Sequence, residues 1–131
     1  MLQTKKVFSG FSVDDVEKAK KFYTEVLGLS LKDEHMGLHL ELPGGGTIFL
    51  YQKDNHQPAS YTVLNFVVDD IDSAVDELVK QGVNFERNEG FPFTEDKKGI
   101  VRGIEAHMGP DIAWFLDPAG NILAVLQENK E

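Results

Sequence analysis

The chain of 131 residues lacks cysteine, so disulfide bonds and thiolate chemistry are excluded. It also lacks an apolar run approaching the ~20 residues that cross a bilayer. Its opening residues, MLQTKKVFSG, contain no apolar core of signal-peptide length. Basic residues are outnumbered by acidic ones, 13 against 22, and the resulting net charge of −9 repels nucleic acid and anionic membranes. We therefore expect a cytoplasmic protein that binds neither nucleic acid nor membrane.

An internal repeat is the most informative feature that the chain does have. Residues 11–23 read FSVDDVEKAKKFY, and residues 66–78 read FVVDDIDSAVDEL. A second pair occurs in the same order, LELPGGGTIFLYQ at 40–52 and FLDPAGNILAVLQ at 115–127. Two copies of a unit too small to bury its own apolar face are expected to share a core. The length suits one domain, so we predict a single domain over residues 1–131.

The first module, residues 1–52, has the pattern of a strand, a helix and three further strands. Residues 5–13 alternate as a strand, and Asp14 or Asp15 can cap a following amphipathic helix that ends at Gly28. The three further strands are expected at 29–34, 37–42 and 47–52, with a Gly-rich turn before the last.

A polar linker at 53–60 precedes a second module, residues 61–131, in which the pattern restarts. A strand at 61–68 leads to a helix at 71–81 that Gly82 ends. Further strands are predicted at 83–87, 100–107, 111–117 and 122–127. Extra residues, mostly 88–103, are expected to form a loop that contributes to specificity. The fold class is therefore α+β, with two βαβββ modules.

Three segments carry a family resemblance: VDDVEKAKKFYTEVLGL at 13–29, FVVDDIDSAVDEL at 66–78 and FLDPAGNILAVLQ at 115–127. With them the chain resembles the vicinal oxygen chelate superfamily, which includes glyoxalase I, bleomycin-resistance proteins and extradiol dioxygenases. The resemblance implies that the two modules form a cup-shaped mixed sheet with helices on its outer face. It also implies a homodimer.

The same resemblance locates the positions where metal-dependent relatives place their ligands. On the first and last strands of each module these positions are occupied here by Phe8, Phe49, Val63 and Ala124. A divalent ion needs lone-pair donors such as imidazole nitrogen or carboxylate oxygen, and these four side chains offer none. We therefore expect neither the usual metal nor another cofactor.

Strand alternation extends the set of residues that would face the cup. The predicted ligand-binding residues are Phe8, Ser12, Phe49, Tyr51, Val63, Asn65, Trp114 and Ala124. Apolar walls with a few polar points are typical of a small-molecule pocket. The same side chains could instead fill the cup themselves, which would leave an interaction module without a ligand.

Two His–Glu pairs are the remaining candidates for chemistry. His39 and Glu41 lie two residues apart on one predicted strand, and Glu105 and His107 do so on another. They could form a displaced metal site or an acid–base pair, although exposed strand faces commonly carry such residues. Two functions follow: metal-free binding of a small aromatic or hydrophobic molecule, or a lyase, isomerase or dioxygenase that uses a displaced metal or a His/Glu base.

Overall fold

The computed structural model describes residues 1–86 and 96–129, which belong to two compact units, Met1–Pro58 and Ala59–Glu131. Residues 88–95 of the predicted 88–103 loop lie outside the described residues. Within the described part, no helix is both long enough and apolar enough to cross a membrane.

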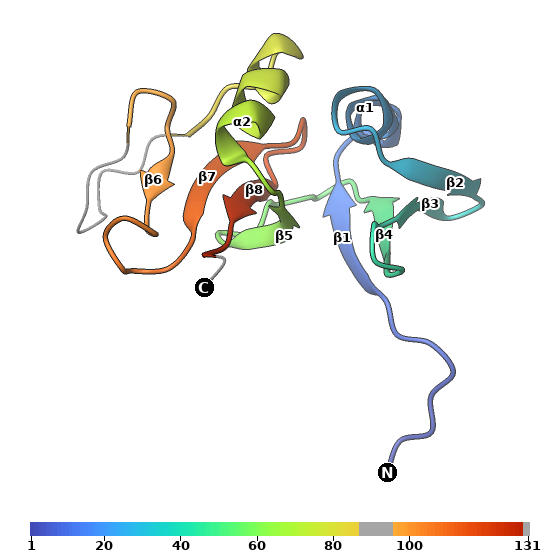
Figure 1. Cartoon of the computed structure of the whole chain (residues 1–131). Coiled ribbons are helices and arrows are strands. Elements are labelled where there is room, and N and C mark those ends of the chain that lie inside the picture. Colours follow the sequence, from blue (N-terminus) through green and yellow to red (C-terminus); the bar gives the residue numbers. More distant parts are fainter. Residues whose placement is uncertain (87–95, 130–131) are drawn as a thin grey trace. The chain divides into compact units, whose positions relative to one another are not determined.

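The first unit contains a mixed four-stranded sheet with a helix over one face (Figure 1). Its elements are β1 (Ser9–Val13), α1 (Val16–Lys21), the π-helical turn η1 (Phe22–Val26), β2 (Ser30–Glu34), β3 (Gly37–Glu41) and β4 (Thr47–Gln52). The strand order is β1-β4-β3-β2, with β1 parallel to β4 and the other neighbours antiparallel. This unit therefore has the predicted βαβββ order.

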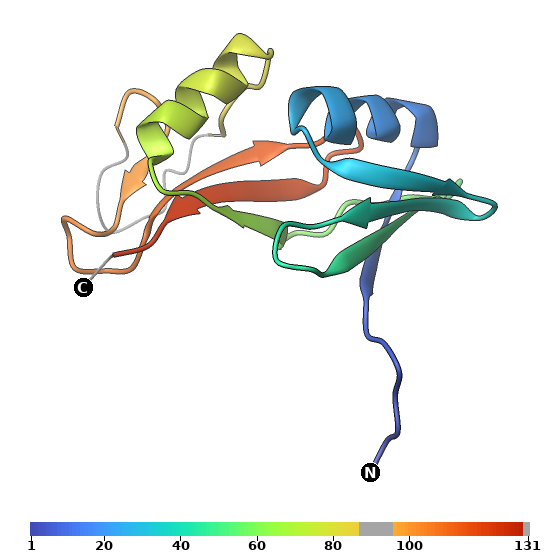
Figure 2. The same cartoon turned by 45° about the vertical axis from the view of Figure 1, so that its right-hand side comes forward.

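The second unit repeats this arrangement, and α2 lies over its sheet in both views (Figures 1 and 2). Its elements are β5 (Thr62–Val67), α2 (Ile71–Lys80), β6 (Val101–Arg102), β7 (Asp111–Leu116) and β8 (Ile122–Gln127). The order β5-β8-β7-β6 matches that of the first sheet, and β5 is parallel to β8. The predicted α+β class is confirmed.

Aspartates start both helices, as the sequence predicts. Asp15 accepts hydrogen bonds from the backbone nitrogens of Glu17 and Lys18, 3.0 and 3.2 Å away. Asp70 accepts one from the backbone nitrogen of Ser73 at 3.2 Å. Such caps satisfy N–H groups that have no partner within the helix.

Alternation along the strands separates a buried face from an open face in each sheet. In the first unit, Leu40 and Leu50 are fully buried, whereas Phe49, which precedes Leu50 on β4 and points to the opposite side, is half-buried. In the second unit, Phe115 and Leu123 are fully buried. We call the side of each sheet away from its helix the open face.

Three strand predictions need correction. The strand predicted at 100–107 is limited to Val101–Arg102, and the chain then turns. The cause is local: Gly103 lies so close to the next strand that a Cβ there would come 2.2 Å from the carbonyl oxygen of Pro110. Of the predicted strand 83–87, the described residues form a single bridge, Phe85 to Phe115. The first strand begins at Ser9 rather than at residue 5.

Candidate functional site

The open face of the first sheet carries four ring side chains, which we call the aromatic ladder: Phe8, His39, Phe49 and Tyr51. The ring centroids of His39 and Phe49 are 4.9 Å apart, and those of Phe49 and Tyr51 are 5.8 Å apart. The rings of Phe49 and Tyr51 are inclined by only 21°. Phe8 extends the ladder, with its centroid 5.8 Å from that of His39. Phe8 remains 52% exposed and Tyr51 37%, so a ligand can reach both ends.

Two glycines lie close to Phe49, Gly10 beside its backbone and Gly37 beside its ring. Gly10 is the strand partner of Phe49 on β1, and a Cβ there would lie 3.1 Å from the Phe49 carbonyl oxygen. A Cβ on Gly37 would lie 3.0 Å from the Phe49 ring and 2.2 Å from the carbonyl oxygen of Leu50. The ring of Phe49 therefore lies against β3 at a place where a side chain in place of Gly37 would force a neighbour to shift.

Polar side chains contact or adjoin the ladder, and two of them, His56 and Glu34, were not predicted from the sequence. Ser12, the strand partner of Tyr51, is hydrogen-bonded through Oγ to Nδ1 of His56 at 2.6 Å. His39 Nε2 lies 3.3 Å from a carboxylate oxygen of Glu34. The predicted partner of His39, Glu41, instead faces Lys32 at 3.7 Å.

The open face of the second sheet contains the other predicted binding residues. Asn65, Ala124 and Trp114 are adjacent on β5, β8 and β7. Val63 lies at a register shift between Thr62 and Leu64, so it interrupts the regular alternation. A bulge changes the direction in which nearby side chains point. Alternation in the sequence alone does not predict this change.

Trp114 lines a pocket of about 290 Å³. We call it the Trp114 pocket, and its described lining residues are Ser60, Tyr61, Thr62, Glu86, Trp114, Leu116 and Ile122. The indole Nε1 donates a hydrogen bond to Oγ1 of Thr62 at 3.0 Å. The backbone nitrogen of Glu86 donates to the carbonyl oxygen of Trp114 at 2.7 Å, which fixes Glu86 beside the aromatic residue.

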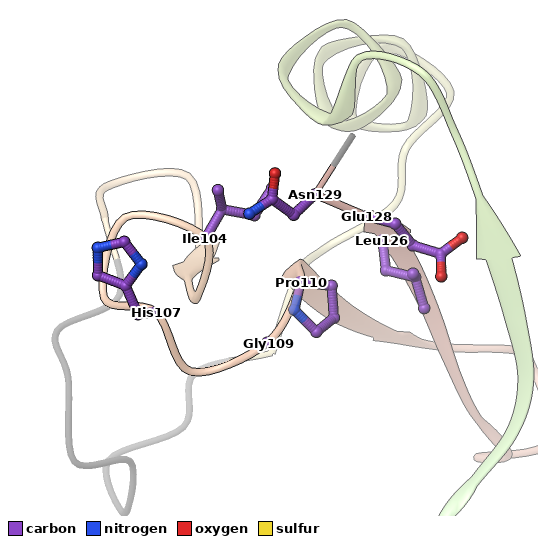
Figure 3. Close-up of a pocket in the computed structure, with 7 residues that line it drawn as sticks. All are labelled: Ile104, His107, Gly109, Pro110, Leu126, Glu128 and Asn129. Carbon is purple, nitrogen blue, oxygen red and sulfur yellow. The ribbon is translucent and has the colours of Figure 1, made fainter. Parts of the chain in front are cut away.

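A second pocket, of about 420 Å³, lies beside the turn that replaces the predicted strand. Figure 3 shows His107 and Glu128 at opposite sides of it, with Ile104, Pro110 and Asn129 between them. Glu105 and His107 thus lie in a turn rather than on one strand face, and His107 has a positive φ of 56°. The predicted geometry of this His–Glu pair is wrong because the strand ends at Arg102.

An ion-pair cluster holds the chain around β6 against α2. Arg102 binds both carboxylate oxygens of Asp72, at 3.1 and 2.9 Å, and also Asp96 at 2.7 Å. Hydrogen bonds from Arg102 lower the pKa of Asp72 to about 2, against the opposing effect of burial. Burial likewise opposes ionisation of Asp96, but hydrogen bonds from the Ile100 backbone nitrogen and from Arg102 lower its pKa. This cluster is structural in character.

The four residues that the resemblance assigns to the family's metal positions are all apolar. Phe8, Phe49, Val63 and Ala124 have no donor atoms in their side chains. Within residues 1–86 and 96–129, no three His, Cys, Asp or Glu side chains gather closely enough to hold an ion.

The fold of the two units can now be compared with known families. The family model described as the Glyoxalase/Bleomycin resistance protein/Dioxygenase superfamily matches residues 8–125. The chain belongs to this superfamily, as its sequence resemblance indicated.

Solved structures share the fold over nearly their whole length. A superfamily member from Sphaerobacter thermophilus DSM 20745 is 27% identical with a TM-score of 0.66, covering 97% of this chain and 100% of its own. TnmS3, an antibiotic-binding protein from Streptomyces sp. CB03234, is 25% identical with a TM-score of 0.62, covering 98% and 100%. FosX, a fosfomycin resistance protein from Listeria monocytogenes, is 14% identical with a TM-score of 0.67, covering 98% and 97%, and so shares the fold alone. The curated protein sequences contain no match.

Proposed function

We propose that this protein is a metal-free binding protein that holds a small aromatic or hydrophobic molecule on the open faces of its sheets. The aromatic ladder is the observation that carries the proposal. Its rings lie in one row on one face, and its two ends remain exposed. Aromatic pairs in offset or tilted contact contribute about 0.5–1.5 kcal/mol beyond the burial of their area. A flat ligand placed on the ladder would gain several such contacts.

The superfamily relatives support this proposal in a general way. TnmS3 is described as an antibiotic-binding protein and covers this chain almost completely. The aromatic ladder, with a few polar groups beside it, is suited to binding a small molecule in the same way.

A ligand screen tests the proposal. Neutral planar aromatic compounds and saturated compounds of matched size are compared for their effect on the thermal unfolding midpoint. Binding to the native state alone raises that midpoint by mass action. We expect aromatic compounds to stabilise the protein and their saturated counterparts to do so much less. Failure of every aromatic compound would overturn the proposal and favour an interaction module.

The metal-free part of the proposal has its own test. Side chains without donor atoms occupy all four positions that the resemblance assigns to metal ligands. Elemental analysis of protein purified without chelator is expected to find no stoichiometric Zn, Ni, Mn or Fe. One metal ion per chain would overturn this part and leave ligand binding to be judged by the screen.

One observation favours an enzyme as the second candidate. Glu34 lies 3.3 Å from Nε2 of His39, and His39 also contacts the ring of Phe49. A histidine oriented by a carboxylate beside a ligand surface can act as a general base, for example in an isomerase or lyase. Ligands from the screen that carry an acidic C–H bond are incubated with protein in D₂O and followed by NMR. Enzyme-dependent deuterium incorporation that His39→Gln abolishes would support this function, and unchanged ligand would exclude it.

The resemblance also leads us to propose a cytoplasmic homodimer. The mass of the purified protein in solution, measured by sedimentation, tests the dimer directly. A monomer at all accessible concentrations would overturn it.

A further inference from the structure

We propose that the segment from Leu2 to Val7, which we call the N-terminal arm, binds the free edge of strand β2 in a second copy of this chain. This inference rests on the proposed homodimer and names the two surfaces that would form it. The arm and β2 both belong to the first unit, and all residues of the arm are exposed.

The arm extends beyond the strand with which it would pair in its own unit. Alternation in the sequence predicts a strand from residue 5, but pairing with β4 begins at Ser9, which lies opposite Ile48. Strand β4 itself begins at Thr47, and the residues before it, 42–46, form a turn. The register therefore carries the arm past the end of β4, and both views show it leaving the sheet (Figures 1 and 2).

The composition of the arm suits it to binding another surface. Leu2 is 89% exposed and Val7 is 82% exposed. Lys5 and Lys6 are adjacent, so in an extended chain their side chains would point to opposite sides. An extended segment of this kind can add as a strand to the edge of a sheet, where its backbone gains hydrogen bonds and its side chains determine the partner.

Strand β2 provides such an edge. Among the described strands it is the outermost of the first sheet, with β3 as its neighbour on one side. Its residues from Lys32 to Glu34 are exposed. The N–H and C=O groups of an edge strand can pair with another chain, and charged side chains on the edge oppose indiscriminate pairing.

The charges at the end of β2 are opposite to those of the arm. Asp33 and Glu34 are adjacent and point to opposite faces of the sheet: Asp33 contacts Lys20 of α1, whereas Glu34 lies beside His39 of β3. Both carboxylate side chains are nevertheless at least half exposed. A strand added here would meet one carboxylate on each face.

Two adjacent lysines match this arrangement. With the arm beside β2, Lys5 and Lys6 would each lie across from a carboxylate, one on each face, whichever direction the arm runs. Cross-strand pairs of opposite charge stabilise a sheet, and like charges in the same positions destabilise it. Each chain supplies one arm and one edge, so two copies can exchange arms in a reciprocal contact that closes as a dimer.

Charge reversal in two variants tests this contact. The arm variant carries Lys5→Glu and Lys6→Glu, and the edge variant carries Asp33→Lys and Glu34→Lys. Each variant alone sets like charges against each other, so we expect its dimer dissociation constant, measured by sedimentation, to rise about 10-fold or more. An equimolar mixture of the two variants should recover dimerisation, because both contacts of the mixed dimer again join opposite charges.

The matched control carries Lys53→Glu and Lys80→Glu, since both lysines are exposed and lie outside the arm and β2. It changes the net charge by the same amount as the arm variant and should leave the dissociation constant unchanged. Thermal unfolding of each variant checks that it folds. Equal weakening in the control and the arm variant, or no recovery in the mixture, would overturn the proposal.

Introduced cysteines give a second measurement that does not depend on charge reversal, because the chain has no cysteine of its own. Thr4→Cys is mixed with His35→Cys, which would lie across from it in antiparallel pairing, and with Lys32→Cys for parallel pairing. We expect a disulfide between the two chains in one of these mixtures, and none with Glu77→Cys, which is exposed on α2. No disulfide in either mixture, or equal reaction with Glu77→Cys, would overturn the arm contact.

The outcomes distinguish this inference from the proposed function. A wild-type protein that stays monomeric at all accessible concentrations would overturn the proposed homodimer and this inference with it. A wild-type dimer whose dissociation constant is unchanged in the arm variant would overturn the arm contact alone and leave the homodimer standing. Small-molecule binding is judged separately, by the ligand screen.

Discussion

The side-chain oxygen of Gln127, at the end of β8, accepts a hydrogen bond from the backbone nitrogen of Ile71, the first residue of α2, at 3.0 Å. The first unit repeats the contact: Gln52, at the end of β4, accepts from the backbone nitrogen of Val16 at 2.9 Å. The glutamine that ends both copies of the second sequence repeat therefore ties the last strand of each module to the start of its helix. The same contact in both units gives this glutamine a structural role.

Replacement of Gln127 by methionine should lower the free energy of unfolding by about 1 kcal/mol, because the N–H of Ile71 loses its acceptor while the shape changes little. Urea denaturation followed by circular dichroism measures the change. The control is Gln81→Met, since the Gln81 side chain is exposed and makes only a 3.5 Å contact with Glu77. Equal effects of both substitutions would show that the Gln127 contact contributes nothing specific.

The architecture of each module could be predicted because it depends on local signals. Asp15 and Asp70 mark the helix starts, and alternation places Phe49 and Ala124 on the face away from the helices. Fold class follows from these patterns, since one face of every sheet must be buried.

Some contacts of the candidate site could not be predicted, because they depend on the register between strands. Glu34 reaches His39 because the two-residue turn at His35 and Met36 pairs β2 with β3 in one particular alignment. The turn after Arg102 depends on the close approach of backbone to backbone at Gly103, which no periodic pattern reveals.

The ion pair between Asp72 and Arg102 should make stability depend on pH in the acid range. The pKa of Asp72 is lowered to about 2 by Arg102, whereas an aspartate in the unfolded chain titrates near ~3.9. A lowered folded-state pKa stabilises the native protein above the unfolded value, and this stabilisation is lost as the pH falls from about 4 to about 2. Because the Asp72 side chain is 46% exposed, solvent screening limits the effect to about 1 kcal/mol or less.

The measurement is the free energy of unfolding of the wild type and Asp72→Asn between pH 7 and pH 2. We expect the difference between the two proteins to be constant above pH 5 and to shrink as the carboxylate protonates. Asp69→Asn is the control, because Asp69 is exposed, and its difference from the wild type should be smaller throughout. An Asp72→Asn difference that does not change with pH would contradict this assignment.

Substitution of Gly37 by alanine should destabilise the first unit by about 1–3 kcal/mol, the usual range for forced overpacking. The added Cβ would meet the Leu50 carbonyl oxygen at 2.2 Å and the Phe49 ring at 3.0 Å. Gly46→Ala is the matched control, since the nearest atom there, Cδ1 of Leu42, is 3.8 Å away. Chemical denaturation of both variants checks the prediction, and similar midpoints would show that β3 adjusts without cost.

Phe49→Leu should weaken the binding of a planar aromatic ligand about 5- to 10-fold, because the central ring of the ladder is lost while an apolar side chain remains. Isothermal titration with an aromatic compound from the screen measures the change. Phe22→Leu is the control: Phe22 lies on η1, where its ring contacts Tyr23 at a centroid distance of 5.2 Å. It should lower stability and leave affinity intact, since its ring is no part of the ladder. Loss of affinity in Phe22→Leu but not in Phe49→Leu would place the ligand away from the open face, and the ladder would then be a packing feature of the sheet.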